Sequence, residues 1–133
     1  MSTRSYIGYI QQDGTAKFAY CHCDGYLAGV GWVLMNFYNK NDKIKALVDK
    51  GSMSSIDENI NYIEYYGDEP IVVKKDAISS FLNDTWGEYA YLWSGLSWFY
   101  QEAPFDNNNW KRLSDKFEKK TIVTYELKEA SED

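Results

Sequence analysis

The chain has 133 residues, a length that fits one domain and excludes a large multidomain enzyme. Hydrophobic residues make up 44% and aromatic residues 17%, which is enough for a core and excludes an intrinsically disordered chain. Two cysteines exclude a disulfide-stapled scaffold, and no apolar run approaches the roughly 18 residues of a membrane span. Because no apolar stretch of the signal-peptide type follows Arg4, we expect a cytoplasmic protein.

The charge is unevenly distributed. The chain has 14 basic and 20 acidic residues and a net charge of −6, and residues 57–106 hold ten of the acids but only two lysines. Phosphate groups attract lysine and arginine, so this distribution argues against direct binding of DNA or RNA as the main role.

The first predicted element is a β-hairpin. Residues 5–10 and 17–23 are rich in β-branched and aromatic side chains, and Asp13-Gly14 between them is a typical tight turn. Such a hairpin places Arg4 near Asp24, so we expect an ion pair between them.

Two helices should follow the hairpin. Gly25 is expected to supply the unusual backbone angle that turns the chain into a helix over residues 26–37, where apolar residues recur at three- and four-residue steps. A second helix is predicted over residues 42–50, with Asn41 as its N-cap and Gly51 at its end.

The middle of the chain predicts two strands and a helix. Residues 60–66 and 71–73 form the strands, and the turn at 67–70 separates them. Asp76 is then expected to cap a helix of about two turns.

The last third predicts a second hairpin, in which residues 89–93 pair with 98–102. A short helix over residues 110–119 and a strand over 121–127 should follow. We interpret the acidic residues 129–133 as a frayed tail.

These elements define a fold class. Strands mixed with short helices, without repeats or linkers, predict a single α+β domain over residues 1–128. It should contain an antiparallel sheet of about five to seven strands with two to four short helices.

The segment Cys21-His22-Cys23-Asp24 contains metal-ligand residue types but does not favour a metal site. On a strand, the two cysteines lie on one face and His22 on the other, and the chain has no further cysteine or histidine to complete a zinc site. The sequence also lacks a phosphate-binding loop and a dinucleotide fingerprint. We therefore expect no metal and no cofactor, and enzymatic activity is not favoured.

Aromatic residues are interleaved with the acids of residues 57–106. Tyrosine and tryptophan are enriched where proteins contact partners, although any one ring can equally belong to the core. The residues that we predict for a protein-binding face are Glu64, Tyr65, Tyr66, Asp68, Glu69, Trp86, Glu88, Trp93 and Trp98.

Several segments resemble a family of small phage and prophage proteins. The similarity rests on Thr3-Arg4-Ser5, on residues 20–26 (Tyr-Cys-His-Cys-Asp-Gly-Tyr) and on Leu47 to Ser55, and it covers residues 1–56 well. The chain departs from the family at Cys23, where tryptophan is usual, and at Leu27, where proline is usual. The resemblance implies a phage or mobile-element origin, and small acidic phage proteins often bind and block a host defence protein.

The favoured function is therefore a phage-encoded, non-enzymatic inhibitor of a host defence protein, of the anti-CRISPR type or similar. Its acidic, aromatic-rich face would imitate nucleic acid and bind a host protein that has a basic nucleic-acid-binding surface, in the cytoplasm of the bacterial host. One alternative is a sponge that sequesters a nucleotide immune signal, with phosphates held by Arg4, Lys74 or Lys75. A less favoured alternative is a metal-assisted hydrolase built on His22 and Asp24.

Overall fold

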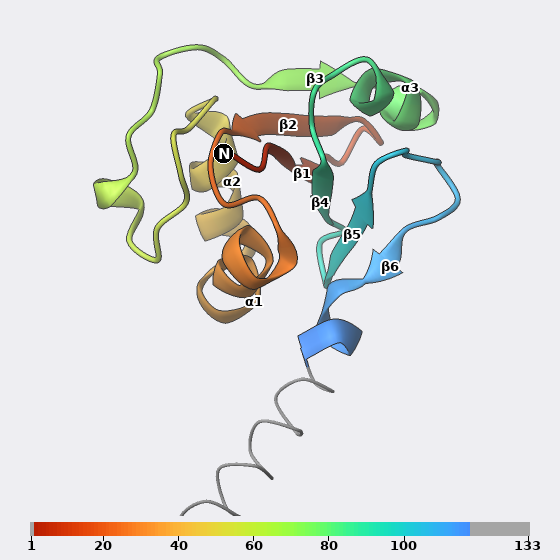
Figure 1. The fold of residues 1–133 in the computed structure, drawn as a ribbon. Coiled ribbons are helices and arrows are strands. Elements are labelled where there is room, and N and C mark those ends of the chain that lie inside the picture. Colours follow the sequence, from red (N-terminus) through yellow and green to blue (C-terminus); the bar gives the residue numbers. More distant parts are fainter. Residues whose placement is uncertain (1, 118–133) are drawn as a thin grey trace, which may run out of the picture.

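Six strands form one mixed β-sheet at the centre of the molecule (Figure 1). The computed structural model describes residues 2–117, so the predicted strand over 121–127 and the tail at 129–133 lie outside the described residues. The strand order is β3-β2-β1-β4-β5-β6, which together with the helices makes a single α+β domain. The strands are β1 (Ser5–Ile10), β2 (Ala16–Cys21), β3 (Ile71–Val73), β4 (Tyr89–Trp93), β5 (Trp98–Glu102) and β6 (Lys111–Arg112).

Both predicted hairpins are confirmed. β1 pairs antiparallel with β2, and β4 pairs antiparallel with β5. Glycine occupies a left-handed position in each connection, with φ of 87° at Gly14 and 105° at Gly95. Residues with a Cβ resist this conformation, so the two glycines fix where each hairpin turns.

The expectation of a wholly antiparallel sheet is wrong at its centre, where β1 and β4 run parallel. A parallel pair is normally buried on both faces, so its strands are continuously apolar rather than alternating. β4 fits this description, because four of its five residues are buried.

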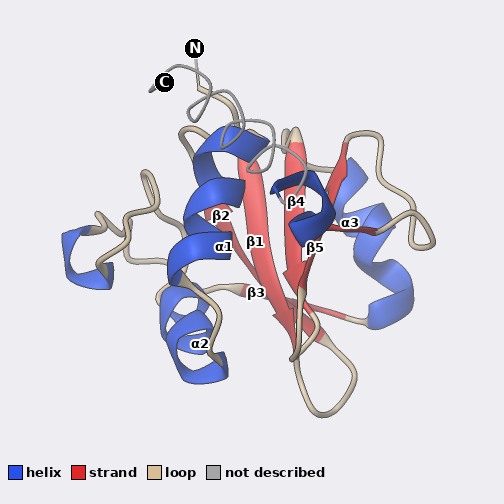
Figure 2. Ribbon diagram, turned by 90° about the horizontal axis from the view of Figure 1, so that it is seen from below, coloured by secondary structure: helices blue, strands red, loops and turns tan. Residues whose placement is uncertain are grey.

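The helices cover both faces of the sheet (Figure 2). α1 (Trp32–Phe37) and α2 (Asn41–Asp49) lie on one side, and α3 (Ile78–Asn83) lies on the other. The larger core cluster joins the first side to Ile7, Tyr91 and Trp98. The smaller cluster, under α3, contains Phe18 and Leu92.

The chain enters α1 through a π-helical turn, η1 (Leu27–Gly31). A Cβ on Gly29 would lie 2.2 Å from the carbonyl oxygen of Asp24, so this glycine allows a close approach of the backbone. The predicted helix over residues 26–37 is therefore present, but its first turn is wound differently.

Two predicted helix caps are wrong. α2 begins at Asn41 itself, and the Asn41 side-chain oxygen accepts a hydrogen bond from the indole N–H of Trp93 at 2.7 Å. Asp76 lies within a 3₁₀ turn, η3 (Lys75–Ala77), and α3 has no side-chain cap. At Asn41, the hydrogen bond from Trp93 engages the side chain that was expected to cap the helix. At Asp76, a 3₁₀ turn occupies the position that was expected for the cap.

Two predicted secondary-structure segments are also wrong. Residues 60–66 contain a 3₁₀ turn, η2 (Ile60–Tyr62), and a single bridge from Tyr65 to Met53 rather than a strand. The helix expected from residue 110 begins only at 113, because β6 precedes it and pairs with β5.

Buried tyrosine hydroxyls tie the sheet to the surrounding segments. Tyr91 donates a hydrogen bond to the Gly25 carbonyl oxygen at 2.7 Å, and Tyr38 donates one to the Asp57 carbonyl oxygen at 2.6 Å. Burial raises the pKa of Tyr38 to about 12, with a further contribution from Asp57. Burial also raises the pKa of Tyr91 well above its ordinary value.

We expect the free energy of unfolding to fall as the pH rises above about 10, the ordinary pKa of tyrosine. Because the folded-state pKa values are raised, the stabilisation is complete below that pH and is lost as the buried phenols ionise. Urea unfolding at about pH 8 and about pH 11 measures the effect. Equal free energies of unfolding at both pH values would contradict the prediction.

Candidate functional site

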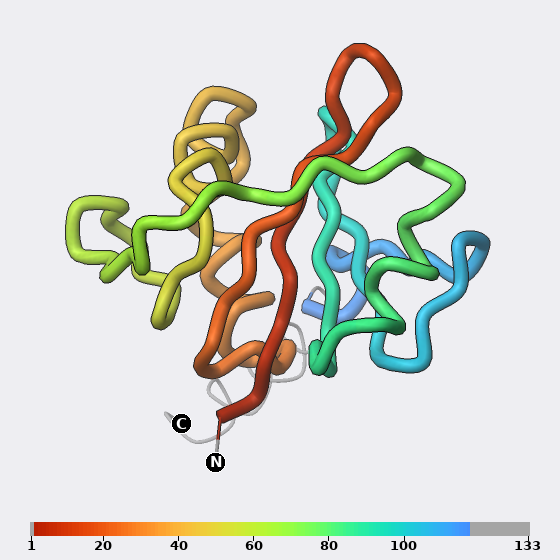
Figure 3. The backbone as a smooth tube through the Cα atoms, turned by 90° about the horizontal axis from the view of Figure 1, so that it is seen from above, coloured from red at the N-terminus to blue at the C-terminus, as the bar shows by residue number. Residues whose placement is uncertain are grey.

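Residues 57–69, which we call the acidic loop, project to one side of the sheet between α2 and β3 (Figures 1 and 3). The loop contains five acidic residues and no basic residue. Its acids are Asp57, Glu58, Glu64, Asp68 and Glu69. Half of the negative charge predicted for the contact region is therefore concentrated in 13 consecutive residues.

Hydrogen bonds from the buried Tyr38 and from the partly buried Tyr65 of the loop itself anchor the acidic loop. Tyr38 reaches the backbone of Asp57 at its start, and the Tyr65 hydroxyl donates to the Leu47 carbonyl oxygen at 2.9 Å. Burial raises the pKa of Tyr65, so the hydroxyl remains a donor at neutral pH. The loop is thus held to α2, and Ile63 adds an apolar contact with the core, while Tyr62 and Glu64 on either side of Ile63 are exposed.

The end of the acidic loop is fixed by a carboxylate. Asp68 accepts hydrogen bonds from the backbone N–H and the hydroxyl of Ser52, both at 2.7 Å. These bonds from Ser52 lower the pKa of Asp68, first through the hydroxyl and then through the backbone. Asp68 therefore has a structural role as well as the binding role that the sequence predicts.

Two tyrosines and three glutamates are among the exposed residues of the acidic loop. Tyr62 is 77% exposed and Tyr66 is 52% exposed. Glu58, Glu64 and Glu69 are also exposed. Exposed tyrosines are enriched at surfaces that bind other proteins, and the neighbouring carboxylates would complement a basic partner. Tyr62 is one of the aromatic residues interleaved with the acids, but it is not among the residues that the sequence predicts for the binding face.

The structure separates the predicted binding residues into three places. Glu64, Tyr65, Tyr66, Asp68 and Glu69 belong to the acidic loop. Trp86 and Glu88 lie on the segment between α3 and β4, where Trp86 is 84% exposed.

The prediction that Trp93 and Trp98 belong to a contact face is wrong. They are only 6% and 3% exposed, and they belong to the core on the α1 and α2 side. The Trp98 indole donates to the Tyr38 carbonyl oxygen at 2.7 Å. Their position on a central hairpin explains the burial, since the sheet is covered on both faces.

A cleft lies where β1 begins and β2 ends. We call it the Arg4 cleft; it has a volume of about 360 Å³ and is lined by Arg4, Tyr6, Tyr20, Asp84, Thr85 and Trp86. The ring centroids of Tyr6 and Tyr20 are 5.4 Å apart. Burial raises the pKa of Tyr20, whereas Arg4 acts in the opposite direction.

The cysteine and histidine segment borders this cleft. The Tyr20 hydroxyl lies 2.7 Å from Nδ1 of His22. Burial raises the pKa of Cys21 to about 12, so this thiol is protonated at neutral pH. Within residues 2–117, no group of three or more histidine, cysteine, aspartate or glutamate residues is arranged to hold a metal ion.

The prediction of an ion pair between Arg4 and Asp24 is wrong. Among the described residues, the one ion pair within 4.0 Å joins Lys17 to Asp49. The prediction that Gly25 has the unusual backbone angle is wrong as well. Asp24 has it instead, with φ of 57°. Gly25 is needed for space instead, because its Cβ would lie 2.7 Å from that of Ser5 and 2.8 Å from the Thr3 carbonyl oxygen.

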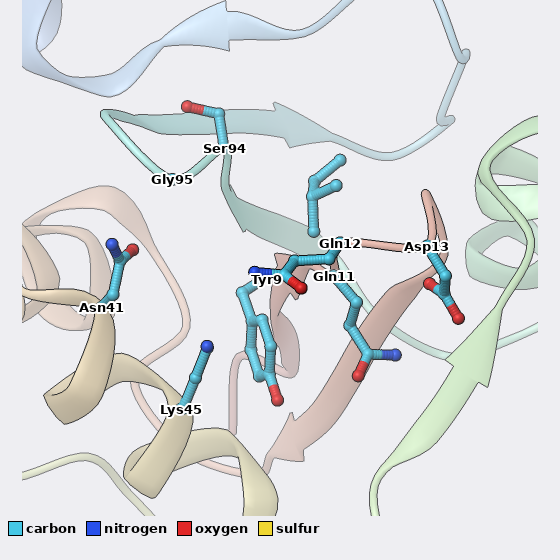
Figure 4. A pocket seen from close by; sticks show the side chains of 9 residues that line it. Tyr9, Gln11, Gln12, Asp13, Asn41, Lys45, Ser94 and Gly95 are labelled. Atoms are coloured by element: carbon cyan, nitrogen blue, oxygen red, sulfur yellow. The ribbon is translucent and has the colours of Figure 1, made fainter.

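A larger, open hollow of about 650 Å³ lies at the carboxyl ends of β1 and β4 (Figure 4). Lys45 points from α2 into the space between Asn41 and Tyr9, and Ser94 approaches from the turn after β4. Lys45 and Asp13 are the charged residues of its lining; the others are neutral. This hollow suits a polar solute, but its lining does not select one chemical class.

Comparison of the chain with known protein families, with curated proteins and with solved structures gave no match in any of the three. Among residues 2–117, no helix is both long enough and apolar enough to cross a membrane.

Proposed function

We propose that the protein binds another protein through the acidic loop. The proposal is supported by one observation: hydrogen bonds fix the backbone of the acidic loop to the rest of the fold, while aromatic and acidic side chains of the loop remain exposed. The loop is held through Asp57, Tyr65 and Asp68, while Tyr62 and Glu64 extend from it into solvent.

The chemistry of the acidic loop indicates a basic partner. Five acids without a compensating lysine or arginine produce a negative potential that attracts and orients a positively charged surface. The exposed tyrosines add contact area at a small cost in side-chain entropy. A groove that normally binds nucleic acid offers the complementary charge, so the loop would occupy it as a mimic of phosphates.

We further propose that the protein is a phage-encoded inhibitor of a bacterial defence protein, of the anti-CRISPR type or similar, acting in the host cytoplasm. This part rests on the resemblance of residues 1–56 to phage and prophage proteins and on the charge of the loop. The mode of action is binding and blocking rather than chemistry.

The test neutralises the three loop glutamates, whose carboxylates accept no hydrogen bond within the described residues. We expect the triple variant Glu58→Gln, Glu64→Gln, Glu69→Gln to bind its captured host partner about tenfold more weakly or worse at physiological salt. The wild-type affinity should also fall as salt is added, because the attraction between exposed charges is screened. Affinity capture from host lysate, followed by titration of the purified partner, measures both effects.

A matched control carries the same change in net charge elsewhere. Asp76→Asn, Glu102→Gln, Asp115→Asn alters three exposed acids outside the acidic loop. The control should keep most of the affinity. If the two triple variants bind equally well, net charge rather than the loop governs binding, and the proposal fails.

A further inference from the structure

We propose that the Arg4 cleft binds a free nucleotide, with the base stacked on Trp86 and the phosphate held by Arg4. This inference goes beyond the proposed protein binding and does not depend on it. It rests on three features of the cleft: an exposed indole, an arginine with no carboxylate within 4.0 Å among the described residues, and a carboxylate on the same lining.

The indole of Trp86 is free to stack. It is 84% exposed, and it lines the cleft together with Tyr6 and Tyr20. Aromatic side chains bind nucleobases by stacking, whichever base is present. The remaining rings are already engaged, since Tyr6 packs edge-on against Phe81 at 5.5 Å between ring centroids. Trp86 is therefore the ring on which the base would stack, and Tyr6 and Tyr20 line one side of the cleft.

The guanidinium of Arg4 is available for an anion. Within residues 2–117 it has no carboxylate within 4.0 Å, although the chain has 20 acidic residues. Glu88 contacts Arg4 at its backbone: the Glu88 carboxylate accepts a hydrogen bond from the Arg4 N–H at 3.2 Å, and the Glu88 N–H donates to the Arg4 carbonyl oxygen at 2.8 Å. Arginine binds phosphate through paired N–H donors, which makes an unpaired arginine beside an aromatic cleft a phosphate-binding group.

The carboxylate of Asp84 restricts the kind of ligand that the cleft can bind. Asp84 lines the same cleft, and its carboxylate accepts hydrogen bonds. A ligand must then offer an aromatic ring, an anion and N–H or O–H donors together. A nucleotide supplies all three through its base, phosphate and ribose. The volume of about 360 Å³ lies within the range of about 300–1,000 Å³ that is usual for small-molecule sites.

The net charge of −6 does not exclude an anionic ligand. At physiological ionic strength, charges beyond about 8 Å are largely screened, so a bound phosphate interacts mainly with the charges next to it, which are Arg4 and the carboxylates of Asp84 and Glu88. Because these carboxylates oppose the attraction by Arg4, stacking on Trp86 has to supply much of the affinity. The alternative phosphate-binding residues, Lys74 and Lys75, are not among the residues that line the cleft.

Calorimetric titration of the full chain with adenosine 5′-monophosphate tests the proposal. We expect measurable binding, weaker binding of adenosine and no binding of inorganic phosphate, because stacking and charge act together. Arg4→Gln should reduce the affinity for the monophosphate about tenfold, to that of adenosine, and Trp86→Ala should abolish the binding of both.

Trp32→Ala is the matched control, since Trp32 is also exposed but lies on α1, on the opposite side of the sheet. It should leave the affinity unchanged, and thermal melts should show that all variants are folded. Three results would overturn the proposal: no binding of the adenine, guanine, cytosine or uracil monophosphates at about 1 mM, unchanged affinity in Trp86→Ala, or tighter binding of an oligoadenylate than of the monophosphate. The last would assign the cleft to a nucleic-acid strand.

Discussion

Replacing Gly51 by alanine is expected to lower the free energy of unfolding by about 3 kcal/mol. Gly51 has φ of 88°, which disfavours any residue with a Cβ, and the added Cβ would lie 2.1 Å from the carbonyl oxygen of Asp68. The substitution therefore combines backbone strain with a clash against the end of the acidic loop. Thermal melting should show a decrease in Tm of about 10 °C.

The control for this prediction is Gly67→Ala. Gly67 has the same φ of 88°, but nothing lies within 4 Å of a Cβ added there. This variant should lose only about 1 kcal/mol, from backbone strain alone. If both variants are destabilised equally, the close approach of Asp68 to Gly51 adds no cost beyond the backbone strain, and the prediction fails.

The second large effect concerns binding. Tyr62→Ala is expected to weaken binding of the host partner about 30-fold, because a central aromatic residue of an interface commonly contributes about 2 kcal/mol or more. Tyr62 is 77% exposed and makes no side-chain hydrogen bond within the described residues. Its removal should therefore leave the Tm nearly unchanged while titration shows the loss of affinity.

Leu96→Ala serves as the control for Tyr62. Leu96 is 90% exposed in the turn between β4 and β5, outside the acidic loop. Its removal should leave partner affinity within about twofold of the wild type. Weakening of the same size in both variants would show that the partner does not centre on the loop.

The hairpins could be predicted because their signals are local. Asp13-Gly14 and Gly95 fix turns between strands that are neighbours along the chain. The parallel pairing of β1 with β4 could not be predicted in this way, since about 80 residues separate Ser5 from its partner Tyr89. Nothing in either strand alone identifies the other.

This missing pairing also explains why the Arg4 cleft was not predicted as a whole. Arg4 comes from the start of β1, whereas Asp84 and Trp86 come from the segment before β4. The backbone N–H of Glu88 donates to the Arg4 carbonyl oxygen at 2.8 Å, which holds the two segments together. From the sequence, Arg4 is predicted as an ion-pair partner of Asp24 or as a phosphate ligand, and Trp86 only as part of a protein-binding face.

The charge of the acidic loop could be predicted from its composition, but its irregular backbone conformation could not. Glu64, Tyr66 and Glu69, which we predict for a binding face, are exposed, but residues 60–66 were expected to form a strand. Tertiary hydrogen bonds from Tyr38 and Tyr65 hold it in an irregular conformation instead. Trp93 and Trp98 show the limit of composition, because residue type alone does not distinguish an interface aromatic from a core one.

Site-specific photo-crosslinking tests the central claim most directly. A photoreactive phenylalanine analogue in place of Tyr62 should form a covalent adduct with the captured host partner, and addition of salt should reduce the yield as binding weakens. The same analogue in place of Leu96 should give little adduct. Equal or stronger crosslinking from position 96, or none from position 62 while the partner remains bound, would contradict the assignment of the acidic loop as the protein-binding surface.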